Sequence, residues 1–309
     1  MGNIACFDIG GTFIKFAVIT SDGEILTKNK FPSPKENCRL TVPQGIIAKS
    51  KELMKEYKIS AVAISTAGVV DSQEGSIIFA TENLPGYTGA RLKASIEEEL
   101  KLPVAVENDV NAAAMGELWM GAGKDRDSFL CLTLGTGIGG AIVINGKLYK
   151  GINNGAGEVG HIIIEEDGDP CTCGNSGCFE RYASTSALIR SYLREAQKEG
   201  HNISSITGEE IMEKVKEEEL LALKVYKRFL KDLVRGLVSL THILDPGLIV
   251  IGGGISSQGK PFFEEVNLLF KEQVLTTYRK GTEIVPAKLN NDAGLYGACY
   301  LVLKEAALL

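Results

Sequence analysis

An internal repeat of a short hairpin pattern constrains the fold more than any other feature of the sequence. Residues 6–19 read C-F-D-I-G-G-T-F-I-K-F-A-V-I, and residues 131–144 read C-L-T-L-G-T-G-I-G-G-A-I-V-I, at a constant offset of 125. Each copy is an apolar strand, a Gly/Thr turn and a second apolar strand, followed by a tight-turn dipeptide, Asp22-Gly23 or Asn145-Gly146. A repeat at this distance predicts two related lobes.

Both turns have the composition of an anion-binding loop. Glycine permits positive φ and lets backbone N–H groups converge on a phosphate without a Cβ in the way. Neither turn is a P-loop or a dinucleotide fingerprint. A purely structural hairpin is the alternative for either turn alone, and the repeat favours phosphate binding. The apolar strand at 248–251 also runs into Gly252-Gly253-Gly254, which permits close approach of a ligand to the backbone.

Composition and charge narrow the class of protein. The 309 residues, 44% of them apolar, suit two α/β lobes rather than one core. The net charge of −6, without a Lys/Arg cluster free of acids, argues against nucleic-acid or membrane partners and favours small molecules. Seven scattered or clustered cysteines and the absence of a signal-peptide pattern predict a reducing cytoplasm.

A cysteine-rich segment predicts a metal site. Residues 160–180 follow the pattern G-H-x9-C-x-C-x4-C-x-E, which supplies His161, Cys171, Cys173 and Cys178. Three thiolates and one imidazole suit tetrahedral Zn²⁺, and the glycines of the segment allow a tight fold around the ion. The alternative, three core cysteines beside an unrelated histidine, is weakened by their polar and glycine neighbours. Because the protein supplies all four ligands, we expect the zinc to be structural.

A carboxylate follows a predicted buried strand. Residues 102–106 are apolar, and Glu107-Asn108-Asp109 comes at their carboxyl end, before a helical pattern at 110–119. Ligands of α/β proteins bind at this edge of the sheet. Asn108 or Asp109 as a simple helix cap is the alternative. Asp8, the two turns and the polar loop at 155–161 favour a catalytic role.

Six motifs together make the chain resemble the ROK family (repressors, open reading frames, sugar kinases) of the actin, hexokinase and heat-shock-70 ATPase superfamily. They are D-I-G-G-T at 8–12, E-N-D-V-N-A-A-A-M-G-E at 107–117, L-G-T-G-I-G-G at 134–140, G-A-G-E-V-G-H at 155–161, C-T-C-G-N-S-G-C-F-E at 171–180 and N-D-A-G-L-Y-G-A at 291–298. The resemblance implies an α/β fold of two ribonuclease H-like lobes with a central cleft. It also implies a homodimer or higher homo-oligomer.

The resemblance assigns roles residue by residue. It implies that Asp109 is the general base that takes the proton of a sugar hydroxyl. The sugar-binding residues would be Gly68, Thr81, Asn83, Asn108, Asp109, Glu158, His161 and Glu180. Those on the side of ATP and Mg²⁺ would be Asp8, Gly10, Gly11, Thr12, Lys15, Gly135, Thr136, Gly137, Gly253 and Gly254. His161 would serve twice, with one ring nitrogen on zinc and the other toward the sugar.

The expected domains are 1–117, completed by a terminal helix at 295–309, and 118–294, which carries the zinc site. The chain departs from the family in the loop at 65–68, which reads Ser-Thr-Ala-Gly where the family often has a proline. This departure bears on sugar identity and leaves the transfer chemistry untouched.

We therefore expect an ATP-dependent hexose kinase, with glucose phosphorylated at O6 as the first hypothesis. N-acetylmannosamine or another amino sugar, β-glucosides and fructose are the alternatives within the class. A sugar-sensing repressor is disfavoured because the strand at 4–9 leaves no room before it for a helix-turn-helix domain. A sugar-binding protein without catalysis conflicts with the presence of Asp109.

Overall fold

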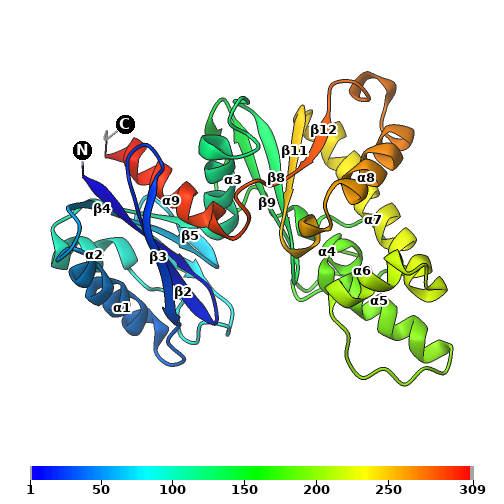
Figure 1. Cartoon of the computed structure of the whole chain (residues 1–309), viewed down its shortest axis with the longest axis horizontal. Coiled ribbons are helices and arrows are strands. Elements are labelled where there is room, and N and C mark those ends of the chain that lie inside the picture. Colours follow the sequence, from blue (N-terminus) through cyan, green and yellow to red (C-terminus); the bar gives the residue numbers. More distant parts are fainter. Residues whose placement is uncertain (1, 307–309) are drawn as a thin grey trace. The chain divides into compact units, whose positions relative to one another are not determined.

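The computed structural model describes residues 2–306, apart from the side chains at 256 and 257. Contacts divide the chain into two compact units (Figure 1). The first comprises residues 1–127, 142–156 and 288–309, and the second comprises residues 128–141 and 157–287. Within the described part of the chain, no helix is long and apolar enough to cross a membrane.

The first unit is built on a five-stranded sheet of order β3-β2-β1-β4-β7. Strands β1 and β2 are antiparallel, and β1, β4 and β7 run parallel. The strands are β1 (Asn3–Ile9), β2 (Phe13–Ile19), β3 (Ile25–Pro32), β4 (Ile59–Thr66) and β7 (Val104–Asn108), with a separate small pair, β5 (Val69–Asp71) and β6 (Ser76–Phe79).

Helices cover both faces of this sheet because successive side chains of its strands point to opposite faces. Phe7 of β1 belongs to the apolar cluster that packs under α1 (Cys38–Leu53) and α2 (Leu92–Leu100). Its neighbour Cys6 belongs to the opposite cluster, under α9 (Ala293–Glu305). Figure 1 shows α1 and α2 together on one side of these strands and α9 on the other.

Helix α3 (Asp109–Met120) packs closely against α9. A Cβ on Gly297 would lie 1.5 Å from the carbonyl oxygen of Ala112, and one on Gly116 would lie 2.3 Å from that of Ala293. The ring of Trp119 stacks on Tyr300 at a centroid distance of 5.6 Å. Glycines on both helices therefore bring the two backbones into contact.

This packing explains why the units differ from the domains expected from sequence. A boundary at 117 would divide α3, whereas the contacts keep the whole helix in the first unit, because it packs on α9. The terminal helix begins at Ala293 rather than 295, and residues 307–309 of the expected helix lie outside the described residues.

The second unit contains the rest of the chain. Its sheet has the order β10-β9-β8-β11-β12, with β8, β11 and β12 parallel. The strands are β8 (Phe129–Leu134), β9 (Ile138–Ile144), β10 (Lys147–Leu148), β11 (Leu248–Gly252) and β12 (Glu283–Pro286), although the contact division assigns the end of β9 and β10 to the first unit. The helices are α4 (Glu180–Ala183), α5 (Thr185–Lys198), α6 (Gly208–Lys216), α7 (Leu220–Leu244) and α8 (Lys260–Gln273). Short 3-10 turns are η1 (Val159–His161), η2 (Gly254–Gln258), η3 (Thr276–Tyr278) and, in the first unit, η4 (Asn290–Asp292).

The repeated hairpins predicted from sequence are present, and the second unit also contains a long buried helix. The strand pairs β1–β2 and β8–β9 are neighbours in their sheets, and α7 buries the apolar side of its three-four pattern. Asn145 and Gly146 both have positive φ, 51° and 68°, as the tight turn at that dipeptide requires.

Candidate active site and metal centre

In the first unit, Asn108 and Asp109 stand where β7 ends and α3 begins. The Asn108 Oδ1 accepts hydrogen bonds from the backbone N–H groups of Val110 at 2.9 Å and Asn111 at 3.2 Å, so Asn108 is the helix N-cap. Its Nδ2 donates to the carbonyl oxygen of Gly68 at 2.9 Å. The capping alternative is therefore correct for Asn108.

The carboxyl group of Asp109 has a strongly perturbed pKa. Burial raises its pKa, the nearby charge of Asp8 raises it further, and the hydrogen bond from the Val110 N–H lowers it, with a resulting pKa of about 6. A base with a pKa slightly below neutral is ionised at physiological pH and still accepts a proton readily. Perturbation of this kind by burial and a like charge is typical of functional carboxylates.

Asp8 is held at the end of β1 by two side chains. Its Oδ1 accepts from the Ser65 hydroxyl at 2.8 Å, and its Oδ2 lies 3.0 Å from the Lys15 ammonium. Lys15 also donates to the carbonyl oxygen of Asn291 at 3.2 Å. A Cβ on Gly294 would lie 3.1 Å from Asp8 Oδ1, so the start of α9 closes tightly over this carboxylate.

An ion pair between Glu107 and Lys150 holds the end of β7. Glu107, 3% exposed, accepts from the Asn108 N–H at 3.0 Å and from the Asn111 amide at 3.1 Å. Lys150 lies 2.5 Å from its other oxygen and also contacts the Ser72 hydroxyl. Sequence reasoning missed Lys150 and Ser65, because neither stands in a distinctive motif; Glu107 was within the E-N-D motif but received no role.

The first Gly turn lies beside the loop expected to hold the sugar. Gly10 and Gly11 connect β1 to β2, and the exposed Thr12 follows them. A Cβ on Gly11 would lie 3.2 Å from Cβ of Asn83. Asn83 and Thr81 are both exposed and follow β6. The structure therefore brings these two expected groups together within one unit.

One expectation about the turns is wrong. Gly10, Gly11, Gly135 and Gly137 do not have positive φ. A Cβ on Gly137 would lie 2.4 Å from Glu180 Oε2 and would displace that flexible side chain, whereas one on Gly135 would meet nothing within 4 Å. Gly135 is fixed by the bond from its N–H to the Gly137 oxygen and by the Thr185 N–H on its own oxygen, both 3.0 Å. Thr136 between the two glycines is exposed.

At the end of β11, Gly253 is closely packed and Gly254 is not. A Cβ on Gly253, which has a φ of 90°, would lie 2.2 Å from the carbonyl oxygen of Leu134, so close packing alone requires glycine there. Gly254 faces open space and lines a cavity of about 80 Å³. The other residues of this cavity are Thr185, Gly208, Glu209, Met212, Ile255 and Gln258.

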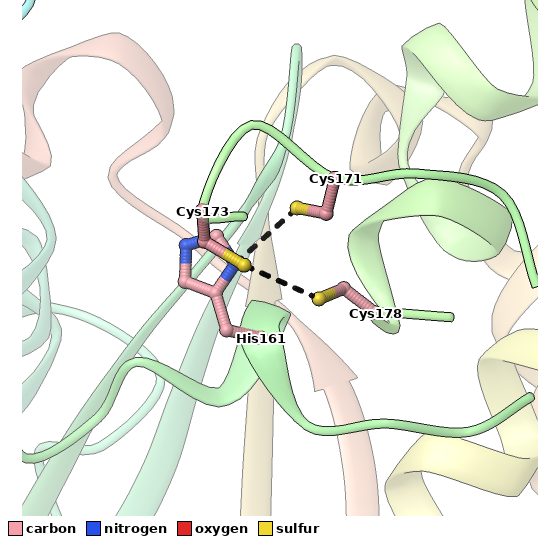
Figure 2. A group of neighbouring side chains, drawn as sticks. All are labelled: His161, Cys171, Cys173 and Cys178. Carbon is pink, nitrogen blue, oxygen red and sulfur yellow. Dashed lines mark hydrogen bonds between the residues drawn. The ribbon is translucent and has the colours of Figure 1, made fainter. Parts of the chain in front are cut away.

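The cysteine cluster predicted from sequence is assembled in the second unit (Figure 2). The donor atoms of His161, Cys171, Cys173 and Cys178 all lie within 4.8 Å of one another. Cys173 Sγ and Cys178 Sγ are 3.6 Å apart, as are Cys171 Sγ and His161 Nδ1. Neighbouring sulfurs in a tetrahedral site with Zn–S bonds of about 2.3 Å are separated by roughly 3.8 Å, so the four donors fit zinc.

Local backbone geometry explains why the cluster forms. Gly174 and Gly177 have φ values of 95° and 77°, and a Cβ on Gly177 would lie 1.7 Å from the carbonyl oxygen of Glu165. Burial and the neighbouring cysteines raise the pKa of the Cys178 thiol to about 12. A bound cation would replace such protons, because the thiolate is the ligand form.

Two expected sugar-binding side chains border the cluster. The Cys171 thiol lies 3.2 Å from Glu180 Oε1, and His161 Nε2 lies 3.9 Å from the exposed Glu158 carboxylate. His161 presents Nδ1 to the sulfurs, which leaves Nε2 as the nitrogen that faces away from the metal position (Figure 2). The predicted double use of His161 is compatible with this orientation.

Comparison with known proteins decides the family. The sequence pattern of the ROK family matches residues 4–305. The chain belongs to the ROK family. It is 35% identical to a glucokinase from Halalkalibacterium halodurans over 314 residues, 96% of this chain and 94% of that one. It is 36% identical to a beta-glucoside kinase from Listeria monocytogenes over 306 residues, 98% of each chain.

Solved structures agree with this ROK assignment. A ROK family glucokinase from Streptomyces griseus, solved with glucose and AMPPNP, has a TM-score of 0.82 and 33% identity, with 97% of this chain and 99% of that one covered. The ROK chain thus has the actin-like ATPase fold expected from its motifs.

Proposed function

We propose that this protein transfers the γ-phosphoryl group of ATP to O6 of glucose, with Asp109 as the general base. The chain is an ATP-dependent sugar kinase of the ROK family. The observation that carries the residue-level proposal is the Asp109 carboxyl group, which stands at the end of β7 beside Asn108 with a pKa of about 6.

Phosphoryl transfer requires alignment and charge neutralisation more than covalent catalysis. Asp109 would orient the attacking hydroxyl and take its proton, and Asn108 would contact a neighbouring hydroxyl. Gly68 supports this geometry, because its carbonyl oxygen accepts a hydrogen bond from the Asn108 amide. Thr81 and Asn83 then face the sugar from the exposed loop after β6.

On the phosphate side, we assign Asp8 and Lys15 to the triphosphate and its Mg²⁺, which neutralises phosphate charge when bound. The turns at Gly10–Thr12 and Gly135–Gly137 would approach the phosphates through the backbone. Gly254 and its small cavity, with apolar walls from Met212 and Ile255, would lie against the nucleotide base.

Within the second unit, we assign His161, Glu180 and Glu158 to sugar hydroxyls. With Nδ1 of His161 on zinc, the ring proton would reside on Nε2, which would donate to a sugar hydroxyl. Glu180 and Glu158 would accept from sugar hydroxyls beside it. A bound zinc would hold the ring rigidly and fix its tautomer.

Glucose is the first choice of sugar because proteins named as glucokinases are 35% and 33% identical to this chain. A relative named as a beta-glucoside kinase supports one alternative, and N-acetylmannosamine and fructose complete the set. Family resemblance also leads us to propose a homo-oligomer, which sedimentation equilibrium would test.

A coupled kinase assay over glucose, N-acetylmannosamine, fructose and a β-glucoside, with ATP as donor, tests the proposal. We expect glucose to give the highest kcat/KM. A clear preference for the acetylated sugar or the glucoside would overturn the choice of sugar, whereas absence of transfer to every hexose would contradict Asp109 as the base of a hexose kinase.

A further inference from the structure

A basic pocket lies on the second unit, beside the short helix α4 that also carries Glu180. It has a volume of about 220 Å³, and its walls come from α4, α5 and α7, which pack against one another (Figure 1). Five of its side chains are cationic and three are acidic, in a protein whose net charge is −6. The cations are Arg181, Arg194, Lys198, Lys224 and Arg228, and the acids are Asp169, Glu195 and Asp232.

Four of the five cations have acidic partners near the rim. Glu195 lies 2.6 Å from both Lys198 and Lys224, and Arg194 lies 3.2 Å from Asp169. Arg228 lies 3.8 Å from Asp232. The cations of these pairs are largely exposed, so the pairs are weakly held and exchange readily for another anion.

Arg181 differs from the other four. Among the residues that the structure describes, it has no ion-pair partner, and its Nε is buried without a hydrogen-bond acceptor. A buried donor without a partner costs free energy that a bound acceptor would recover. The guanidinium of Arg181 is thus a charged group in a pocket wall with one buried N–H that lacks an acceptor.

A second arginine adds to the positive potential at this position. Arg190 donates from Nη2 to the carbonyl oxygen of Arg181 at 3.0 Å, and its own Nε is also buried without an acceptor. Burial and then the neighbouring Arg181 charge lower the pKa of Arg190, whereas Asp169 and Glu180 raise it. The two guanidinium groups repel each other, and an anion beside Arg181 would relieve that repulsion.

We propose that this pocket binds a phosphoryl group, either as inorganic phosphate or on a small phosphorylated metabolite, with Arg181 as its anchor. The planar fork of a guanidinium matches two phosphoryl oxygens, and the rim lysines add point charges. The volume is below the range of roughly 300–1,000 Å³ for drug-sized ligands, which argues against a nucleotide.

The pocket is connected to the cysteine cluster through short links. Arg181 follows Glu180 within the single turn of α4, and the carbonyl oxygen of Asp169 accepts from the Gly177 N–H in the cysteine loop at 3.0 Å. An anion that holds Arg181 therefore also fixes the position of Glu180. We infer that phosphate alters sugar affinity through α4, and this second step rests on the proposed function.

Isothermal titration calorimetry with inorganic phosphate tests the site itself. The titration is run on the whole protein alone and again with saturating AMPPNP and glucose. The second titration blocks the proposed phosphate turns, so any phosphate that still binds must bind elsewhere. We expect one binding event that persists in both conditions and weakens about tenfold or more in Arg181→Gln. Lys227→Gln, an exposed cation on α7 outside the pocket, is the matched control and should bind like the wild type.

Lys224→Gln at the rim gives a second variant in case Arg181→Gln fails to fold, and it should weaken binding several-fold. A titration with glucose 6-phosphate in place of inorganic phosphate distinguishes the two sources of the phosphoryl group. The compound that binds with the higher affinity is the better candidate for the ligand. Equal phosphate affinity in wild type and both pocket variants, or no binding event that survives AMPPNP and glucose, would overturn the site.

The coupling has its own measurement. The KM for glucose is compared with and without inorganic phosphate, and we expect a change of severalfold in the wild type and none in Arg181→Gln. Phosphate binding that depends on Arg181 but leaves the KM unchanged would retain the site and overturn its effect on sugar binding. Failure of the kinase activity itself would leave the calorimetric result intact, so the two proposals fail separately.

Discussion

The carboxylate of Glu180 occupies the space beside Gly137: a Cβ on Gly137 would lie 2.4 Å from Glu180 Oε2. The second Gly turn and an expected sugar-binding residue are therefore neighbours within one unit. Glycine at position 137 leaves room for this carboxylate.

This contact predicts opposite effects for two glycines of one turn. Gly137→Ala should displace the flexible Glu180 side chain and raise the KM for sugar by roughly tenfold or more, with little change in the KM for ATP. Gly135→Ala meets nothing within 4 Å in the protein and should instead raise the KM for ATP, because its Cβ occupies the approach of a phosphate. Steady-state kinetics with each substrate varied in turn measures both KM values. An equal rise in the KM for sugar and the KM for ATP in either variant would contradict the assignment.

The pH dependence of kcat/KM reports the ionisation of Asp109. The base must be deprotonated, so activity should fall on the acidic side with an apparent pKa near 6. The like charge of Asp8 raises this pKa, so Asp8→Asn should move the acidic limb to lower pH, even though its overall activity is reduced. An acidic limb that stays in place in Asp8→Asn would show that another group controls it.

Because the folded-state pKa of Asp109 is raised, the sign of its effect on stability is also fixed. The folded protein binds this proton more tightly than the unfolded chain, so stability from this group is present below pH 4 and is lost as pH rises through about 6. Asp109→Asn should therefore be at least as stable as the wild type at neutral pH. Thermal unfolding measures this directly, and a marked loss of stability would point to a structural role for Asp109.

Purified protein should contain one zinc per chain. Cys173→Ser should lower both zinc content and thermal stability, because the binding free energy of a structural metal contributes to folding. Cys38→Ser is the matched control: Cys38 is the buried first residue of α1, in the first unit, and its variant should keep the zinc. Metal analysis of protein prepared without chelators decides the matter, and zinc absent from the wild type would refute the centre.

We expect substitution of Glu117, which has no proposed catalytic role, to lower the stability of the fold. This carboxylate is fully buried and accepts from the backbone N–H groups of Ala122, Lys288 and Leu289 at 2.6, 3.1 and 2.8 Å. Glu117→Gln turns one acceptor into a donor and should lower the free energy of unfolding by about 1–3 kcal/mol. The exposed Glu98→Gln should change it by less than about 0.5 kcal/mol. Similar denaturation midpoints for the two variants would contradict this role.

The sequence predicted the fold class and the members of the His/Cys cluster because both leave local signatures. Apolar runs and glycine turns mark the β1–β2 and β8–β9 hairpins, and the spacing of Cys171, Cys173 and Cys178 places three possible ligands in one short loop. His161 joins the predicted ligand set because it lies only ten residues before Cys171.

Features that depend on distant contacts escaped prediction. The Lys150–Glu107 pair joins residues 43 positions apart, and nothing near Lys150 distinguishes it from a surface lysine. The need for glycine at Gly137 and Gly297 comes from Glu180 and Ala112 in other elements, so a purely local argument from φ gave the wrong reason at Gly137. The unit boundary was displaced for the same reason, since the contact of α3 with α9 joins the middle of the chain to its end.

The most direct test of the account is phosphoryl transfer to glucose by Asp109→Asn, measured beside glucose binding by calorimetry. The amide keeps hydrogen-bonding capacity but is not basic, so kcat should fall by roughly 10²- to 10⁴-fold while glucose affinity changes little. Near-normal turnover in this variant would contradict Asp109 as the base, and with it the central claim.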